Sequence, residues 1–195
     1  MKKESLESKF YSLLKETKRE GIDSVISWLK EEGFEKCPAS TKPGRHGAYE
    51  GGLLEHSYNT YTLFKEKNER YSLGLEEDSV RIVALLHDAC KVGSYTEKKL
   101  KDGKKSEKQP FRYETNFHFG HGEKSVYLLM KQGLKLSDEE AMMIRWHMGA
   151  YETAWTEFDN SDRVKSVAKA VTALQAADQE ASAYLDKKTE GDDSE

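Results

Sequence analysis

The chain has 195 residues and a formal net charge of -4, with 31 lysines and arginines against 35 aspartates and glutamates. This length can bury one substantial core but is short for two domains. The acidic balance disfavours strong binding to long nucleic acids. The sequence also has no apolar run of membrane-spanning length and no apolar segment near Met1, so we expect no membrane association and a cytoplasmic location.

The N-terminal third is predicted to be helical scaffold followed by a long loop. Apolar residues recur at helical spacing from Leu6 to Leu14, and Asp23-Ser24 offers a cap for a second helix that ends at Gly33. We expect residues 1–33 to pack on the same domain as residues 34–186. The stretch 34–52 is rich in proline and glycine, which predicts a loop.

Helices dominate the remainder, with one interruption. Amphipathic patterns predict helices over about 53–70, 78–90, 122–131, 137–148 and 163–185, and residues 187–195 form a polar tail. Ser137 and Glu140 fit a capping box. Between Ser94 and Phe119, aromatic residues flank a lysine-rich stretch around Asp102-Gly103, which predicts a small β-hairpin. The expected fold is an all-α bundle with this hairpin as an insertion.

Several polar residues fall on helix faces that should be buried. His56 shares a stripe with Leu53, Thr60 and Leu63, and the other helices repeat this pattern. A single inward histidine is more often a satisfied core residue, and a single aspartate could pair with an arginine. The full set is explained most simply by a shared divalent metal, because its imidazoles and carboxylates would satisfy one another through the ion. Its members are His56, His87, Asp88, His121, His147 and Asp178.

The order of these residues resembles the HD-domain metal-dependent phosphohydrolase superfamily, whose signature is an adjacent His-Asp pair. The surrounding stretches "HGAYEGGLLEHS", "LLHDACK", "FGHGEKSVYLL" and "IRWHMGAYE" are similar to stand-alone HD proteins of bacteria and phages. They are also similar to the HD domain of 3'-5' exoribonucleases that carry an OB-fold domain. The resemblance covers roughly residues 34–186 and implies an HD-type helical bundle.

The resemblance also implies a metal centre with two ions. One ion would be held by His56, His87, Asp88 and Asp178, and a second by His121 and His147 with Asp88 bridging. Ligation by imidazole and carboxylate without cysteine favours Mn²⁺, Fe²⁺, Co²⁺ or Mg²⁺ over a structural zinc site. The expected reaction is attack of a metal-activated hydroxide on phosphorus, with Asp88 and Lys91 as the catalytic residues.

Substrate contacts are predicted around this centre. Lys91, three residues after Asp88, is expected to meet a metal-held phosphate, and a solvated surface lysine is the alternative. Large side chains near His147, those of Trp146, Met148, Tyr151 and Trp155, could stack on a base or belong to the core. The lysines between 98 and 108 form either a lid or a solvated strand edge. Weaker candidates for phosphate contact are Arg45, His46, Lys124 and Arg145, and Tyr151 is a further candidate for substrate binding.

Three functions are consistent with these features. The leading one is hydrolysis of phosphate esters of nucleotides or similar small substrates, as a nucleotidase or a phosphodiesterase. The second is a 3'-5' nuclease or phosphodiesterase acting on short oligonucleotides or cyclic nucleotides. The third is a non-catalytic binding module stabilised by metal. The sequence does not distinguish between a monomer and a homodimer.

Overall fold

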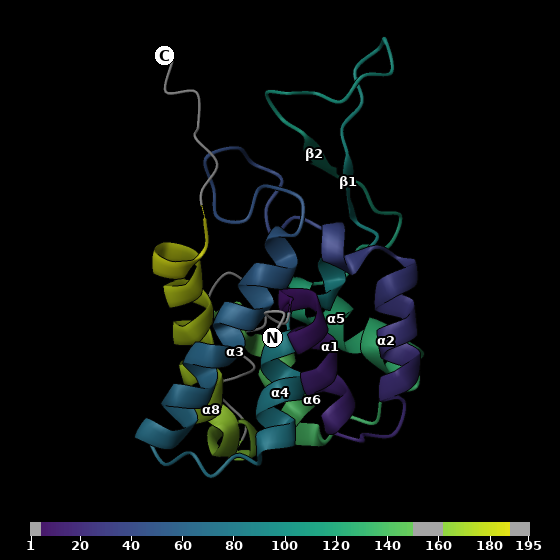
Figure 1. The fold of residues 1–195 in the computed structure, drawn as a ribbon. Helices are drawn as coiled ribbons and strands as arrows, with labels where there is room; N and C mark the ends of the chain where they lie inside the picture. The colour runs from purple at the N-terminus through teal and green to yellow at the C-terminus, as the bar shows by residue number, and fades with distance from the viewer. Residues whose placement is uncertain (1–4, 150–161, 188–195) are drawn as a thin grey trace.

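The helices pack around one central helix whose C-terminal half is apolar on all sides. The computed structural model describes residues 5–149 and 162–187, and the side chains of the last helix from residue 167 onward. Among these residues the main helices are α1 (Leu6–Glu16), α2 (Ile22–Glu31), α3 (Gly52–Arg70), α4 (Glu77–Leu86), α5 (His121–Lys131), α6 (Asp138–Trp146) and α8 (Asp162–Glu180). Figure 1 shows α4 between α3 and α1, with α8 beside α3 at the outer edge of the bundle. The predicted helical bundle is confirmed.

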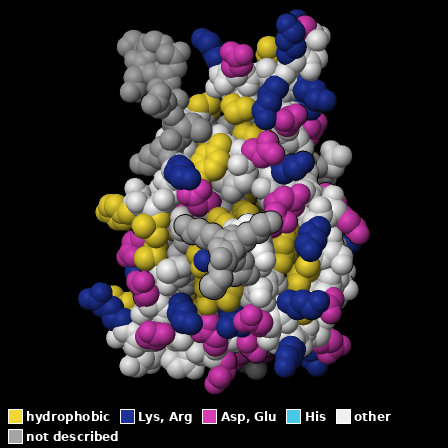
Figure 2. Space-filling model, in the orientation of Figure 1, with side chains coloured by type: hydrophobic (Ala, Val, Ile, Leu, Met, Phe, Trp, Pro, Cys, Tyr) yellow, Lys and Arg dark blue, Asp and Glu magenta, His cyan; other side chains and the backbone are white. Residues whose placement is uncertain are grey.

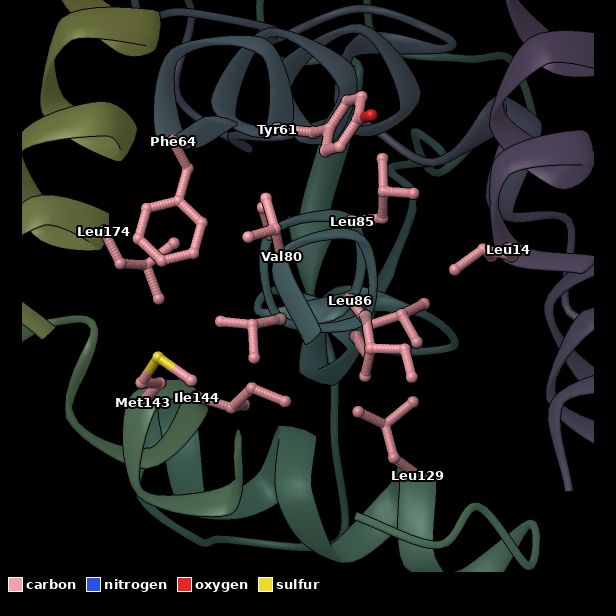
Figure 3. Close-up of a cluster of buried hydrophobic side chains, with 14 of the residues drawn as sticks. Leu14, Tyr61, Phe64, Val80, Leu85, Leu86, Leu129, Met143, Ile144 and Leu174 are labelled. Atoms are coloured by element: carbon pink, nitrogen blue, oxygen red, sulfur yellow. The ribbon is translucent and has the colours of Figure 1, made fainter. Parts of the chain in front are cut away.

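The core forms where the other helices contact α4. Val80, Leu85 and Leu86 of α4 are at most 1% exposed, and both Ile82 and Val83 are fully buried. A helix with this pattern must be covered on every side. Figure 3 shows the result: side chains converge on α4 from α1, α3, α5, α6 and α8, among them Leu14, Tyr61, Phe64, Leu129, Met143, Ile144 and Leu174.

A partly buried ion pair joins the first two helices to the rest of the bundle. Arg19, in the turn between α1 and α2, donates from both terminal nitrogens to the two carboxylate oxygens of Glu140 at 2.6 and 2.8 Å. Ser79 of α4 donates to the same carboxylate at 2.7 Å. The Glu140 side chain therefore connects the N-terminal segment with α4 and α6.

Helix ends confirm one predicted cap and overturn another. Ser137 caps α6 in a capping box with Glu140, as predicted. The predicted Asp23-Ser24 cap of α2 is wrong, because α2 already begins at Ile22 after Gly21. Gly21 has a φ of +85°, and a Cβ there would lie 2.0 Å from the carbonyl oxygen of Gly133, so the close approach of these two turns fixes the start of α2.

The predicted hairpin is present with very short strands. β1 (Tyr95–Glu97) pairs antiparallel with β2 (Phe111–Tyr113), and the chain turns at Asp102-Gly103, where Gly103 has a φ of +82°. The hairpin extends beyond the end of the bundle in Figure 1. Its lysines contact neighbours within the hairpin, Lys105 to Glu97 at 2.8 Å and Lys98 to Gln109 at 2.6 Å. These contacts favour the interpretation of a solvated edge over that of a lid.

The surface agrees with the mixed charge of the sequence. Figure 2 shows lysine and arginine side chains interspersed with aspartates and glutamates over the visible face. Among the described residues, none of the helices combines the length and apolar character that a bilayer crossing requires.

Candidate metal centre

His87 and His147 each occupy the first position after a helix. α4 ends at Leu86, four residues earlier than the sequence suggested, and His87 is its C-cap, as His147 is the C-cap of α6. The last carbonyls of a helix have no partner within it. The Nδ1 atoms of the two histidines form hydrogen bonds to such carbonyls. His87 contacts the Ala84 oxygen at 2.8 Å, and His147 contacts the Ile144 oxygen at 2.7 Å.

These hydrogen bonds fix the tautomer of both rings. A carbonyl oxygen only accepts, so Nδ1 carries the proton and Nε2 of each ring presents a lone pair to the interior. The His147 Nε2 is buried and has no hydrogen-bond partner among the described residues. Complete burial lowers the pKa of His87 to about 4, although the nearby Asp88 opposes the shift. The His87 ring is therefore a neutral donor of the kind a metal requires.

His56 reaches the same point from α3. Its Nε2 lies 3.1 Å from Asp178 Oδ1 and 3.3 Å from His87 Nε2. Its Nδ1 contacts Asp186 Oδ2 at 2.8 Å. Burial disfavours the charged ring, but hydrogen bonds to Asp178 and Asp186 outweigh it and raise the pKa of His56 to about 9. A proton on Nε2 thus occupies the place that a cation would take.

Asp88 faces two groups of donors with its two oxygens. Oδ2 lies 2.5 Å from Lys91 Nζ and 3.5 Å from the Nε2 atoms of both His56 and His87. Oδ1 lies 2.7 Å from His121 Nε2 and 3.6 Å from His147 Nε2. Lys91 and the neighbouring histidines hold the pKa of Asp88 well below its usual range, against the effect of burial. This carboxylate is therefore ionised at ordinary pH and faces donor groups with both oxygens.

These residues fit a divalent metal. Within the described chain, the ligand atoms of His56, His87 and Asp178 lie within 4.8 Å of one another, as do those of His87, Asp88 and His147. The buried lone pair of His147 has no proton donor, and the carboxylates bring negative charge into the interior. A divalent cation would satisfy both.

One important partner of the centre is absent from the sequence prediction. Asp186, directly after the short turn Ala181–Leu185, is 7% exposed and accepts from both His56 Nδ1 and Asn59 Nδ2, the latter at 2.9 Å. In the sequence it begins a polar tail and resembles a solvated residue. The available clue was Asn59, which lies one turn after His56 on the same helix.

A cavity of about 560 Å³ opens over the centre. Asp88, His121 and Asp178 lie at its wall together with Lys91, so the acids and the lysine are accessible to a ligand. Of the weaker candidates, Arg45 and His46 line it from the loop before α3, and the His46 ring lies 5.4 Å from that of His56. Ser40, Tyr95, Met148, Gln179 and Ser182 also line it.

Other predicted contacts lie elsewhere. Lys124 is buried and donates to the hydroxyls of Ser94 and Thr115 at 2.7 and 2.9 Å, away from the main cavity. Arg145 donates to Glu123 at 2.5 Å and stacks over the buried Trp146 ring. The structure thus does not place these two cations at the cavity, because local partners hold them. Tyr151 and Trp155 lie outside the described residues.

A helical bundle with a buried His-Asp pair at the end of its central helix defines a class of metal-dependent hydrolase. A family model of the HD domain matches residues 53–183, more than half of the chain. The protein belongs to the HD domain family. No curated protein and no solved structure matched the chain in the corresponding searches. The similarity to the HD domain of OB-fold exoribonucleases stays a prediction.

Proposed function

We propose that this protein hydrolyses phosphate esters of nucleotides or similar small substrates at a centre of two divalent ions. The observation that carries the proposal is the cavity in which two carboxylates, two imidazoles and a buried lysine face the same space. Family membership supports metal-dependent phosphohydrolase chemistry. The cavity volume is in the range of small-molecule sites, which favours a mononucleotide-sized ligand over a polymer.

We infer that Asp88 bridges the two ions. Its Oδ2 faces His56 and His87 while its Oδ1 faces His121 and His147, which is the division that a bridging carboxylate needs. Asp178 would complete the first set. Bound divalent ions supply Lewis-acid stabilisation of a phosphoryl group and an activated water near neutral pH.

Lys91 is the residue proposed to hold the phosphate. The residue is 7% exposed and lies at the cavity wall. Its ammonium pairs with Asp88 Oδ2. With Asp88 bound to metal, the Lys91 ammonium would be available to an anionic oxygen of the substrate. Arg45 and His46 on the facing loop would contact the remainder of the phosphate or sugar.

The test measures turnover and metal content together. Purified chain with Mn²⁺ is assayed on nucleoside monophosphates, cyclic nucleotides and short oligonucleotides, and the products distinguish monoesterase from diesterase. We expect Asp88→Ala to lose metal and turnover, and Lys91→Ala to retain metal while kcat/KM falls about 100-fold or more. Lys135→Ala, at an exposed lysine distant from the cavity, is the matched control.

Other outcomes would change the assignment. Full metal content in Asp88→Ala would contradict the bridging role, and unchanged turnover in Lys91→Ala would contradict the phosphate contact. Cleavage confined to oligonucleotides would favour the nuclease. Metal-loaded chain that turns over none of these substrates would leave a non-catalytic binding module as the better interpretation.

A further inference from the structure

Cys90 lies at the edge of the metal centre in a fixed position. It follows Asp88 by two residues in the short helical turn Ala89–Lys91 and is 3% exposed. Its backbone N–H donates to Ser125 Oγ of α5 at 3.1 Å. The turn after α4 is thereby attached to the helix that begins at His121, so the cysteine and this histidine come from two elements with a fixed relative position.

The thiol belongs to a third group of donor atoms. The ligand atoms of Asp88, Cys90 and His121 all lie within 4.8 Å of one another. Sulfur, nitrogen and oxygen ligands of one tetrahedral ion lie about 3.5 Å apart. The observed cluster therefore needs only small side-chain movements to close on a cation. Cys90 and His121 also border a cavity of about 50 Å³ beside the main one.

The other cysteine does not share this environment. Cys37 is buried, and its Sγ lies 3.6 Å from the carbonyl oxygens of Pro38 and Lys91. It is not a member of any of the donor groups found among the described residues. The two thiols are thus comparable in burial and differ in the presence of metal-ligating neighbours.

We propose that the thiolate of Cys90 is a metal ligand, so that Asp88, Cys90 and His121 bind a thiophilic divalent cation of the zinc and cobalt type on the His121 side of the centre. Thiolate ligands shift the preference of a site toward such ions. The sequence suggested a centre without cysteine, and the added sulfur changes the expected metal at this position. The inference rests on the proposed metal centre but not on hydrolysis.

The experiment uses cobalt as an optical probe and zinc as the ion whose affinity is measured. Reduced wild-type chain, Cys90→Ala, Cys90→Ser and Cys37→Ala are titrated with Co²⁺, and thiolate-to-cobalt charge transfer is recorded in the near ultraviolet. We expect this absorption in the wild type and in Cys37→Ala and its loss in both Cys90 variants. Zinc affinity of the Cys90 variants should fall more than about tenfold, and circular dichroism checks their folding.

A measurement on the unmodified chain avoids dependence on variants. X-ray absorption at the zinc edge should show a sulfur neighbour at about 2.3 Å. Absence of sulfur at the zinc edge, or charge transfer that persists without Cys90, would overturn the assignment. Charge transfer without phosphate turnover would retain the thiolate ligand and reject the proposed function. Turnover without charge transfer or a zinc–sulfur contact would support the proposed function and reject Cys90 as a ligand.

Discussion

At the scale of single residues, three imidazoles are oriented by acceptors on their outer side. His87 and His147 use carbonyls of the preceding helical turn, and His56 uses the carboxylate of Asp186. Such outer partners fix the ring and increase the basicity of the inner nitrogen. The orientation of the inner nitrogens is thus set by groups on the outer side of each ring.

The role of Asp186 can be tested by removing its charge. Asp186→Asn keeps the shape but lets Asn59 and His56 compete for a single carbonyl oxygen, so His56 is oriented less firmly. We expect metal affinity to fall about 10- to 100-fold, measured by competition with a chelator. Asp102→Asn, on the exposed hairpin turn, is the control and should bind metal as the wild type does. Equal affinities in both variants would assign Asp186 a purely structural role.

At the scale of elements, the ends of α4, α5 and α6 must lie close together. Gly122, in the first turn of α5, makes this possible, because a Cβ there would lie 2.1 Å from the carbonyl oxygen of Arg145 in α6. The absence of a side chain at this contact lets His121 and His147 reach the same carboxylate. Their rings lie 5.8 Å apart.

Glu140 links the N-terminal segment with α4 and α6 and makes stability depend on pH. Burial raises the pKa of its carboxyl, but hydrogen bonds from Arg19, Ser137 and Ser79 outweigh this and lower it. A lowered pKa in the folded state means that the carboxylate stabilises the fold above its unfolded pKa and that this contribution is lost as the pH falls through the folded value.

A glutamine variant separates this contribution from the rest. Glu140→Gln should lower the free energy of unfolding by about 2 kcal/mol at pH 7, from denaturant titration. The difference between variant and wild type should shrink as the pH falls below the pKa of an unfolded glutamate, about 4.3, and through the lower folded value, where the wild-type carboxylate becomes protonated. Glu139→Gln, at the exposed neighbouring position, should change stability little at either pH. A difference in free energy of unfolding that stays constant with pH would contradict a stabilising role of the Glu140 charge.

At the scale of the whole molecule, the metal centre connects distant parts of the chain. Its candidate ligands come from α3, the end of α4, the start of α5, the end of α6 and α8, so they meet only in the folded state. A cation bound there stabilises the folded protein by about 2.7 kcal/mol at a free concentration of 100 Kd. We expect Mn²⁺ to raise Tm by several degrees over chelator-treated protein.

A variant of one ligand provides the control for this shift. Asp178→Asn removes one negative charge from the first set and should reduce the metal-dependent rise in Tm, measured by calorimetry with and without Mn²⁺. Because Asp178 also accepts from His56 at 3.1 Å, the metal-free variant should itself be less stable than the metal-free wild type, so each protein is compared with its own metal-free form. An undiminished shift would place the stabilising ion elsewhere.

Much of this could be predicted from residue type and spacing. The helical periodicity identified the bundle, and the inward His56, His87 and His147 stood out because imidazoles are costly on an apolar face. The Ser137 cap and the Asp102-Gly103 turn were also predicted correctly, since both depend on interactions within a few residues. The family resemblance supplied the grouping of ligands, and the match to the HD domain confirms the family.

The sequence by itself determined the class of fold, the family and the residues able to bind metal, because these follow from local pattern and side-chain chemistry. Only the tertiary structure decided that Asp186 holds His56, that Lys124 and Arg145 are occupied by local partners, and that Cys90 lies beside His121. These contacts join residues that are far apart in the chain, or they depend on the direction in which a side chain points. They depend on how helices pack, which no short stretch of sequence encodes.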